Sequence, residues 1–286
     1  MRSFHHAEFP PERRGSASVC IPAREEAATI GPIVRSLVEL RERGAIDQVV
    51  VIDAGSADGT GQIAADLGAE VHAQAELLPE MGPVLGKGDA MWRSLTVLTG
   101  EVVCFVDADS EDFGPHYACG LIGPILSEPG IDYVKGFYRR PFKSGGATEP
   151  EGGGRVTELT ARPLLEVFYP ELAAFRQPLA GEIAARRSLL EALPWSTGYG
   201  VEIAQLIDVH REVGLGAMAQ VDLDVRQNRH QPLAALGPMA AAVLGAVAER
   251  LVRDGRLDAA TLEAVPPAVE RPPLRSLRAT TQPARV

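Results

Sequence analysis

Two aspartates, Asp107 and Asp109, stand two positions apart directly after an apolar run at residues 101–106. Carboxylates at this spacing, where a strand gives way to a turn, can bind one divalent cation and its ligand, because hard cations prefer oxygen ligands. An isolated pair of this kind is more often a turn in which aspartate caps the local backbone. Two interpretations are therefore open, a metal and ligand site or a structural turn.

Two further polar turns are expected at the same edge of a sheet. The sequence Pro-Ala-Arg-Glu-Glu at residues 22–26 ends the apolar run at 18–22, and Asp53 ends the run at 48–53. The carboxyl ends of parallel strands lie at one edge, where ligands bind in open α/β sheets. Three polar turns at one edge favour a ligand site over a structural turn.

The elements that position these turns follow from the pattern of apolar residues. Short β-branched runs alternate with longer runs of helical period, which is typical of an α/β fold with a mostly parallel sheet. The predicted strands are residues 18–22, 48–53, 70–72, 101–106, 131–139 and 217–225. The predicted helices are residues 29–43, 62–67, 88–98, 155–167, 199–213 and 233–252.

Two segments lack such a pattern. Residues 143–154 hold five glycines among twelve positions, which predicts a mobile loop rather than a packed element. From Val265 the chain is rich in proline and arginine without an apolar period, so a loosely ordered tail is expected. The expected organisation is one domain in two halves, 16–112 and 113–255, followed by a tail at 256–286.

Length and composition describe a soluble globular chain. Its 286 residues are 45% hydrophobic and 23% charged, which suffices to bury a core. The formal net charge of -10 argues against broad capture of nucleic acid or an anionic membrane. No apolar run approaches the roughly 20 residues of a membrane span, and the N-terminus lacks a secretory signal, so a cytoplasmic protein is expected. The three cysteines have no metal-type spacing, which predicts neither a disulfide nor a zinc site.

Four motifs follow one another in the first half: P-A-x-E-E, V-I-D-A-G-S-A-D-G-T, G-K-G-D-A-M-W and F-V-D-A-D. In this order they resemble the nucleotide-sugar glycosyltransferases of the GT-A fold. The second half adds G-R-V-T-E-L-T-A-R-P-L-L from Gly154, G-Y-G-V-E-I from Gly198 and A-Q-V-D-L-D-V-R from Ala219. These motifs are similar to those of the glucosyl-3-phosphoglycerate synthases, and the related mannosyl-3-phosphoglycerate synthases share them.

The resemblance implies retaining transfer of glucose from UDP-glucose to the 2-hydroxyl of 3-phosphoglycerate, with Mg²⁺ or Mn²⁺ as cofactor. It assigns the nucleotide sugar to the half at 16–112 and the acceptor to the smaller half at 113–255. It also implies a homodimer, with the alanine-rich helix at 233–252 as a possible interface, and a product used in glucosylglycerate or polysaccharide synthesis. Chemistry agrees, because a metal ion and a fixed cation can stabilise the charge on a leaving nucleoside diphosphate.

Alternatives to this activity stay open at this point. One is a mannosyl enzyme that uses GDP-mannose, and another is a non-catalytic nucleotide-sugar binding protein. A Rossmann dehydrogenase is disfavoured, because no G-x-G-x-x-G follows the first strand.

For the nucleotide sugar, the resemblance implies contacts from the turns at the sheet edge. Glu25 stands where the family has asparagine, and Ala54 replaces a common serine, which leaves base selectivity open. Lys87 is expected to contact the nucleotide, although a lysine between two glycines is ordinarily a solvated surface residue. Glu25 and Glu26 could instead favour the start of the following helix through its dipole. The implied set is Pro22, Ala23, Arg24, Glu25, Glu26, Asp53, Ala54, Lys87, Asp107, Ala108, Tyr199 and Glu202.

The resemblance implies that Asp109 is a metal ligand and that Glu202 and Arg226 are catalytic. Glu202 is expected to position hydroxyls of the transferred sugar rather than to act as a nucleophile, and a partly buried structural acid is the alternative. The family pattern has a histidine metal ligand where this chain has Asn228, and His230 follows two residues later. Either Asn228 ligates weakly, or His230 replaces it, or the metal keeps only Asp109 with phosphate and water.

For the acceptor, Gly154, Arg155, Val156 and Thr157 match the family's phosphoglycerate-binding loop, with His230 near the acceptor. The chemistry suits a phosphate, because a glycine admits backbone amides, a helix N-terminus favours anions and a guanidinium holds two phosphate oxygens. The alternative is a flexible linker before a capped helix. The glycine-rich stretch before Gly154 is expected to open for substrate and to close over it, which excludes water.

Overall fold

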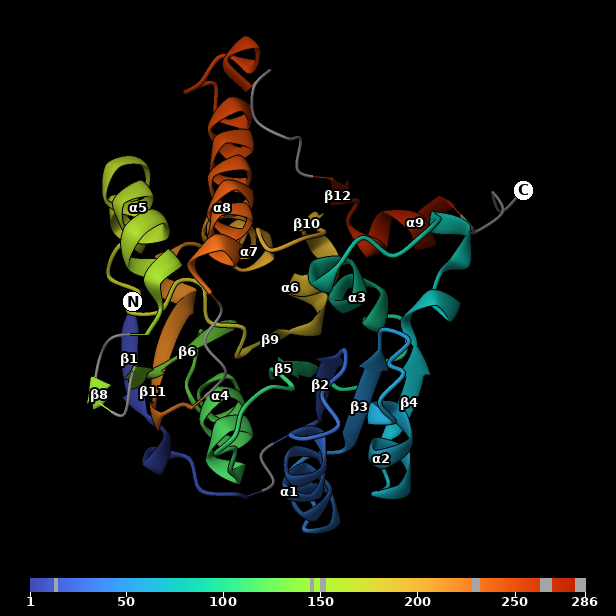
Figure 1. Cartoon of the computed structure of the whole chain (residues 1–286). Helices are drawn as coiled ribbons and strands as arrows, with labels where there is room; N and C mark the ends of the chain where they lie inside the picture. The colour runs from blue at the N-terminus through green and yellow to red at the C-terminus, as the bar shows by residue number, and fades with distance from the viewer. Residues whose placement is uncertain (13–14, 145–146, 150–152, 228–231, 263–268, 281–286) are drawn as a thin grey trace.

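The computed structural model describes residues 1–12, 15–144, 147–149, 153–227, 232–262 and 269–280, and all structural statements concern these residues. Within them eight strands form one sheet in the order β1-β11-β6-β9-β5-β2-β3-β4 (Figure 1). Neighbouring strands are parallel except at β9, which pairs antiparallel with both β5 and β6. The strands are β1 Arg2–His5, β2 Ala17–Ala23, β3 Gln48–Asp53, β4 Glu70–Ala73, β5 Val102–Phe105, β6 Tyr133–Arg139, β9 Ile183–Arg186 and β11 Met218–Val225.

Helices cover both faces of the sheet, because its central strands bury side chains on both sides. Successive residues of β2 show the alternation: Cys20 belongs to one apolar cluster, and Val19 and Ile21 belong to the other. The second cluster includes residues of α1 Ile30–Glu42, α2 Thr60–Asp66 and α4 Pro115–Ser127. The first cluster includes residues of α3 Lys87–Ser94, α5 Arg162–Phe168, α6 Arg187–Ala192, α7 Val201–Val213, α8 Leu233–Arg253 and α9 Leu274–Thr280. The predicted α/β class is confirmed, and each predicted strand and helix is present within a few residues.

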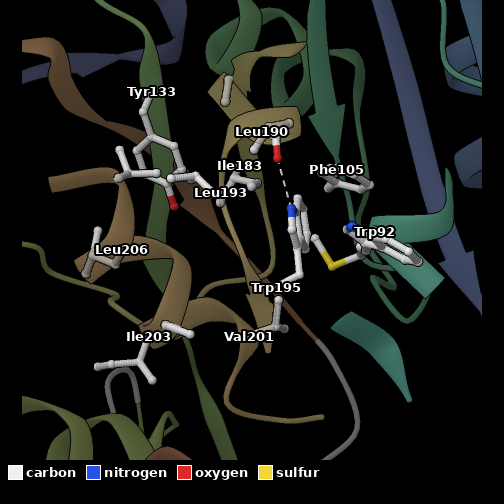
Figure 2. Packing of buried hydrophobic residues seen from close by; sticks show 14 of the residues in the cluster. Trp92, Phe105, Tyr133, Ile183, Leu190, Leu193, Trp195, Val201, Ile203 and Leu206 are labelled. Atoms are coloured by element: carbon white, nitrogen blue, oxygen red, sulfur yellow. Dashed lines mark hydrogen bonds between the residues drawn. The ribbon is translucent and has the colours of Figure 1, made fainter. Parts of the chain in front are cut away.

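Aromatic side chains form the centre of the first cluster (Figure 2). The rings of Phe105 and Trp195 meet edge to face with centroids 6.1 Å apart. The indole nitrogen of Trp195 donates to the carbonyl of Leu190 at 3.0 Å, so its polar atom is satisfied inside the core (Figure 2). Trp92 of α3 and Val201 of α7 join the same cluster, which fixes both helices against the end of β5.

Several described elements were not predicted from the sequence, among them β1, β9 and α4. β1 pairs with β11, and β9 pairs with β5 and β6, so both strands depend on partners far away in the chain. α4 is buried along most of its length, and a helix that is apolar on all sides has no period to detect.

The prediction of a mobile loop at 143–154 is wrong for its described part. Phe142–Ser144 forms β7 and Ala147–Glu149 forms β8, and the two pair antiparallel with Ser144 opposite Ala147.

The prediction of a loosely ordered tail from Val265 is also wrong for residues 269–280. Glu270–Arg271 forms β12, which pairs with β10, Trp195–Ser196, and Leu274–Thr280 forms α9. The helix predicted at 155–167 is present, but Thr157–Ala161 is wound as a π-helix before α5.

One described helix, α8, is long and apolar enough to cross a membrane by length and composition alone. Its residues Val243, Val247 and Leu251 are nevertheless buried in the first apolar cluster. α8 therefore contributes to the core of this fold.

Candidate active site

Asp107 and Asp109 follow β5 at the centre of the sheet, as the sequence predicts. One oxygen of Asp107, Oδ1, lies 2.5 Å from Lys87 Nζ, and the other, Oδ2, lies 3.0 Å from Arg226 Nη1. Arg226 Nη2 lies 2.5 Å from Asp109 Oδ1. Two cations far apart in the sequence, Lys87 and Arg226, therefore converge on the aspartate pair.

Lys87 also binds Glu202. Lys87 is the first residue of α3, and its Nζ lies 3.0 Å from Oε1 of Glu202, in the first turn of α7. Burial opposes the charge on Lys87, but Asp107 and Glu202 outweigh burial and hold the lysine pKa well above its ordinary value. Burial likewise opposes the charge on Asp107, but Lys87 and Arg226 lower its pKa. Both groups are therefore charged at neutral pH.

Gly181, just before β9, forms one wall of this cluster. A Cβ atom at this position would lie 2.3 Å from Asp107 Oδ1 and 2.5 Å from Lys87 Nζ. No side chain fits there, so the glycine is what lets Lys87 reach Asp107.

A buried layer behind the cluster holds Arg226 in place. Its Nη1 lies 2.5 Å from Oε1 of Glu182 and donates to the hydroxyl of Tyr138 at 2.8 Å. The Tyr138 hydroxyl donates to Oε2 of Glu182 at 2.8 Å. Burial raises the pKa of Glu182, although Arg226 opposes the shift. Arg226 is only 2% exposed, so its guanidinium has a fixed position.

Sequence reasoning missed Gly181, Glu182 and Tyr138. The signal available was Glu182 itself, a lone acid in the apolar stretch before Ile183, since an unpaired acid in such a stretch predicts a buried partner. No comparable signal marked Tyr138, on β6.

The turn after β2 is tied to the turn after β3. Glu25 has φ of 55°, its amide donates to the hydroxyl of Ser56 at 3.0 Å, and its carboxylate accepts from the amide of Ala57 at 2.7 Å. The carboxylate therefore fixes the neighbouring turn rather than the start of α1, five residues later, so the helix-dipole interpretation of Glu25 is wrong. Pro22 and Ala23 end β2, and Arg24 is exposed.

Asp53 closes its own turn by accepting from the Ser56 hydroxyl at 2.6 Å. The amide of Ala54 donates to the carbonyl of Ala23 at 2.9 Å, which joins the two turns again. Thr29 lies between Glu26 and Ala108: its hydroxyl donates to the Ala108 carbonyl at 2.7 Å and lies 3.2 Å from Glu26 Oε2. The three polar turns predicted at one edge therefore form one connected surface.

The predicted acceptor segment begins a helical turn on the same side of the sheet as α8. Gly154 has φ of 76°, which favours glycine, and its carbonyl accepts from the amide of Glu158 at 3.1 Å. Arg155 and Val156 are partly exposed, whereas Thr157 is buried at 2% exposure.

Other predicted site residues have different surroundings. Tyr199, predicted to contact the nucleotide sugar, is 60% exposed just before α7. Asn228 and His230 lie outside the described residues, so the structure tests no part of the prediction on them.

Comparisons with known proteins agree with this geometry. The family model of glycosyl transferase family 2 matches residues 18–178. The glucosyl-3-phosphoglycerate synthase of Petrotoga mobilis is 44% identical over 268 residues, which cover 90% of this chain and 82% of the relative. The glucosyl-3-phosphoglycerate synthase of Mycolicibacterium smegmatis is 45% identical over 235 residues, which cover 82% of this chain and 77% of the relative.

Solved structures give the same picture. The mannosyl-3-phosphoglycerate synthase of Rubrobacter xylanophilus is 46% identical, with a TM-score of 0.88, and the match covers 96% of this chain and 97% of that one. The glucosyl-3-phosphoglycerate synthase of Mycobacterium tuberculosis, in complex with Mn²⁺, UDP-glucose and phosphoglyceric acid, is 42% identical. Its TM-score is 0.80, and the match covers 92% of each chain.

The sheet, its flanking helices and the paired carboxylates after the central strand define a glycosyltransferase of the GT-A fold. The two curated relatives narrow the family further. The chain belongs to the glucosyl-3-phosphoglycerate synthase family within glycosyl transferase family 2. The resemblance drawn from the sequence motifs is confirmed.

Proposed function

We propose that this enzyme transfers glucose from UDP-glucose to the 2-hydroxyl of 3-phosphoglycerate with retention of configuration. The observation that carries the proposal is the pair of cations, Lys87 and Arg226, fixed on Asp107 beside Asp109. Fixed cations at this edge suit the negative charge of a leaving nucleoside diphosphate. The substrates are those of the M. tuberculosis relative, whose structure holds UDP-glucose and phosphoglyceric acid.

A divalent cation fits the donor set. The side chain of Asp109 is 33% exposed, and its carboxylate follows the central strand beside the three other acids of the cluster, Asp107, Glu182 and Glu202. Mg²⁺ is usually held by one or two carboxylates together with substrate phosphates. Asp109 is therefore the proposed ligand, with Asn228 or His230 as the second. The bound ion supplies positive charge that neutralises the leaving diphosphate.

The other residues of the cluster bind and orient the donor. Lys87 and Arg226 stabilise the diphosphate oxygens as the bond to the anomeric carbon breaks. Asp107 receives the ribose, and Glu202 orients hydroxyls of the glucose. Because Glu202 is already paired with Lys87 at 3.0 Å, it is a poor nucleophile, which favours attack of the acceptor on the face that the diphosphate leaves.

The connected turns form the proposed site for the base and ribose, with Pro22, Ala23, Arg24, Glu25, Glu26, Asp53, Ala54, Ala108 and Tyr199. Gly154, Arg155, Val156 and Thr157, together with His230, form the proposed acceptor site. Arg155 supplies the guanidinium for the phosphate, and the backbone at Gly154 admits it closely.

A second candidate is transfer of mannose from GDP-mannose to the same acceptor. The mannosyl-3-phosphoglycerate synthase of R. xylanophilus favours it, with 46% identity over nearly the whole chain. The replacement of serine by alanine at Ala54 leaves a base contact without its hydroxyl, which suits relaxed base recognition.

One assay tests both candidates. The purified enzyme is incubated with 3-phosphoglycerate, with Mg²⁺ or Mn²⁺, and with either UDP-glucose or GDP-mannose, and the phosphorylated glycoside is measured by mass spectrometry. A product from UDP-glucose alone supports the proposal, and one from GDP-mannose alone supports the second candidate. No product from either donor refutes both.

The wider setting is also part of the proposal. The enzyme works in the cytoplasm as a homodimer, in one domain with a donor half at 16–112 and an acceptor half at 113–255. Leu233 and Leu244 of α8 are exposed apolar side chains suited to the dimer interface. A monomeric mass by light scattering at micromolar concentration refutes the dimer.

A further inference from the structure

The C-terminal strap, residues 269–280, lies beside α3 and β10 on the side of the sheet that carries Lys87 (Figure 1). The amide and hydroxyl of Thr197 both donate to the carbonyl of Val269, at 2.9 and 2.8 Å. The indole nitrogen of Trp92 in α3 donates to the carbonyl of Pro272 at 2.9 Å. The strap lies outside the residues matched by the family model, and no residue proposed above for binding or catalysis comes from it.

Arg271 is the side chain through which the strap holds α3. Its guanidinium binds Asp89 with two hydrogen bonds, from Nε at 2.9 Å and from Nη2 at 2.7 Å. It also donates to the carbonyls of Met81 at 2.8 Å and Pro83 at 3.1 Å, in the segment that leads into α3. One buried side chain thus fixes both the helix and the chain before it.

Asp89 is the residue on which these bonds meet. It lies two positions after Lys87 and is fully buried, and its carboxylate also accepts from Arg93 Nε at 3.1 Å and from the amide of Leu85 at 2.9 Å. Burial opposes the charge on Asp89, but the bonds from Arg271, Leu85 and Arg93 outweigh burial and lower its pKa. The first turn of α3 is therefore anchored by charge-assisted hydrogen bonds.

The same turn rests tightly on the segment before α7. A Cβ atom at Gly88 would lie 2.0 Å from the carbonyl oxygen of Ser196, and the amide of Asp89 donates to the carbonyl of Thr197 at 3.2 Å. Glu202 follows five residues after Thr197. The strap therefore supports both Lys87 and Glu202, which lie 3.0 Å apart in the cluster.

We propose that Arg271 is a positioning residue for the transfer reaction. It holds the first turn of α3 so that Lys87 stays between Asp107 and Glu202, where the donor diphosphate binds. The inference rests on the proposed function, since that function assigns Lys87 to the donor. Arg271 itself contacts no substrate.

Kinetics of Arg271→Ala and Arg271→Lys test the proposal. We expect the KM for UDP-glucose to rise by about tenfold in Arg271→Ala, because small displacements of a positioned group are costly, while the KM for 3-phosphoglycerate changes less than about twofold. The KM of Arg271→Lys for UDP-glucose is expected to lie between those of the wild type and Arg271→Ala, because lysine keeps the charge but loses the paired hydrogen bonds. The matched control is Arg278→Ala, since Arg278 lies in the same strap but is exposed and pairs with Glu191.

A double-mutant cycle identifies the group through which Arg271 acts. If Arg271 works through Lys87, then Lys87→Met lowers kcat/KM for UDP-glucose less in the Arg271→Ala background than in the wild type, because the lysine is already displaced. Additive effects overturn the proposal. Equal changes in the KM of both substrates also overturn it, since a loss of overall structure has no preference for the donor.

Hydrogen exchange gives a readout that does not need turnover. Amides of residues 81–88 are expected to exchange faster in Arg271→Ala than in the wild type and in Arg278→Ala. Unchanged exchange there overturns the proposal even in a protein that makes no product. Absence of product in the wild type, by contrast, refutes the proposed function alone. Arg271→Lys serves for the exchange measurement if Arg271→Ala does not fold.

Discussion

Substitution of Gly181 by alanine tests whether the contact between Lys87 and Asp107 matters for catalysis. The new Cβ atom would lie 2.3 Å from Asp107 Oδ1 and 2.5 Å from Lys87 Nζ, whereas real contacts of this kind stay above about 3.0 Å. With the backbone of Gly181 in place, Asp107 must therefore move by about 0.7 Å and Lys87 by about 0.5 Å. The backbone of Gly181 is outside the left-handed region, so alanine adds no backbone strain of its own.

The size of the effect follows from this displacement. Overpacking a well-packed site costs about 1–3 kcal/mol of stability, which leaves the enzyme folded. A misplacement of about 1 Å can cost 10²-fold in rate, so a shift of about 0.7 Å predicts a loss of about 10- to 100-fold in kcat for glucosyl transfer. The variant is thus expected to stay folded while its activity falls.

The assay follows release of UDP from UDP-glucose in the presence of 3-phosphoglycerate, and thermal unfolding is measured in parallel. The matched control is Gly216→Ala, since a Cβ atom at exposed Gly216 meets no atom within 4 Å and its φ is also ordinary. Wild-type activity in Gly181→Ala, or a loss equal to that of Gly216→Ala, refutes the reasoning.

Three further predictions concern the same cluster and Lys135, a buried lysine of β6 whose Nζ donates to the carbonyl of Ala180 at 2.8 Å. Lys87→Met is expected to lower kcat by about 10²- to 10³-fold in the UDP-release assay, with Lys87→Arg less affected, and a loss below about tenfold contradicts the role of a fixed cation. Asp109→Asn is expected to weaken Mn²⁺ binding in the presence of UDP by at least about tenfold, measured by calorimetry, and an unchanged affinity would move the metal to other residues. Burial lowers the pKa of Lys135 from 10.5 to about 8, although Glu202 opposes the shift. Between these two pH values Lys135 binds more protons in the unfolded chain than in the folded protein. The free energy of unfolding of the wild type, measured relative to Lys135→Met in urea titrations, should therefore rise from pH 8 to pH 10. A flat or falling difference contradicts the sign.

The elements of the fold that were predictable are those with a strong period. β3 has the predicted bounds of residues 48–53, and α1 differs from its predicted range by one residue at each end, because apolar side chains recur there at the spacing each structure requires. β1 and β9 could not be predicted, since their pairing depends on strands far away in the chain. The strap could not be predicted either, because its order comes from the partners of Arg271 rather than from an apolar pattern.

The residues of the candidate site were likewise only partly predictable from the sequence. Asp107 and Asp109 were predictable, because their position after an apolar strand fixes where they lie in an α/β sheet. The network of Glu182 and Tyr138 behind Arg226 depends on the side-by-side order of β9, β6 and β11, which no local pattern specifies. Gly181 could not be predicted, since the need for a glycine there is visible only beside Asp107 and Lys87.

The pairing of β1 with β11 sets an order of events during synthesis on the ribosome. Arg2 lies opposite Ala219 and His5 opposite Asp222, so β1 has no partner in this sheet until β11 has emerged from the exit tunnel. The whole sheet between them is made in the meantime, and long-range parallel pairs form late. Because Arg226 follows β11 by one residue, the strand that receives the N-terminus also delivers the last cation to the cluster. Completion of the sheet edge and completion of the charged cluster are therefore expected to occur together, once β11 and Arg226 have emerged.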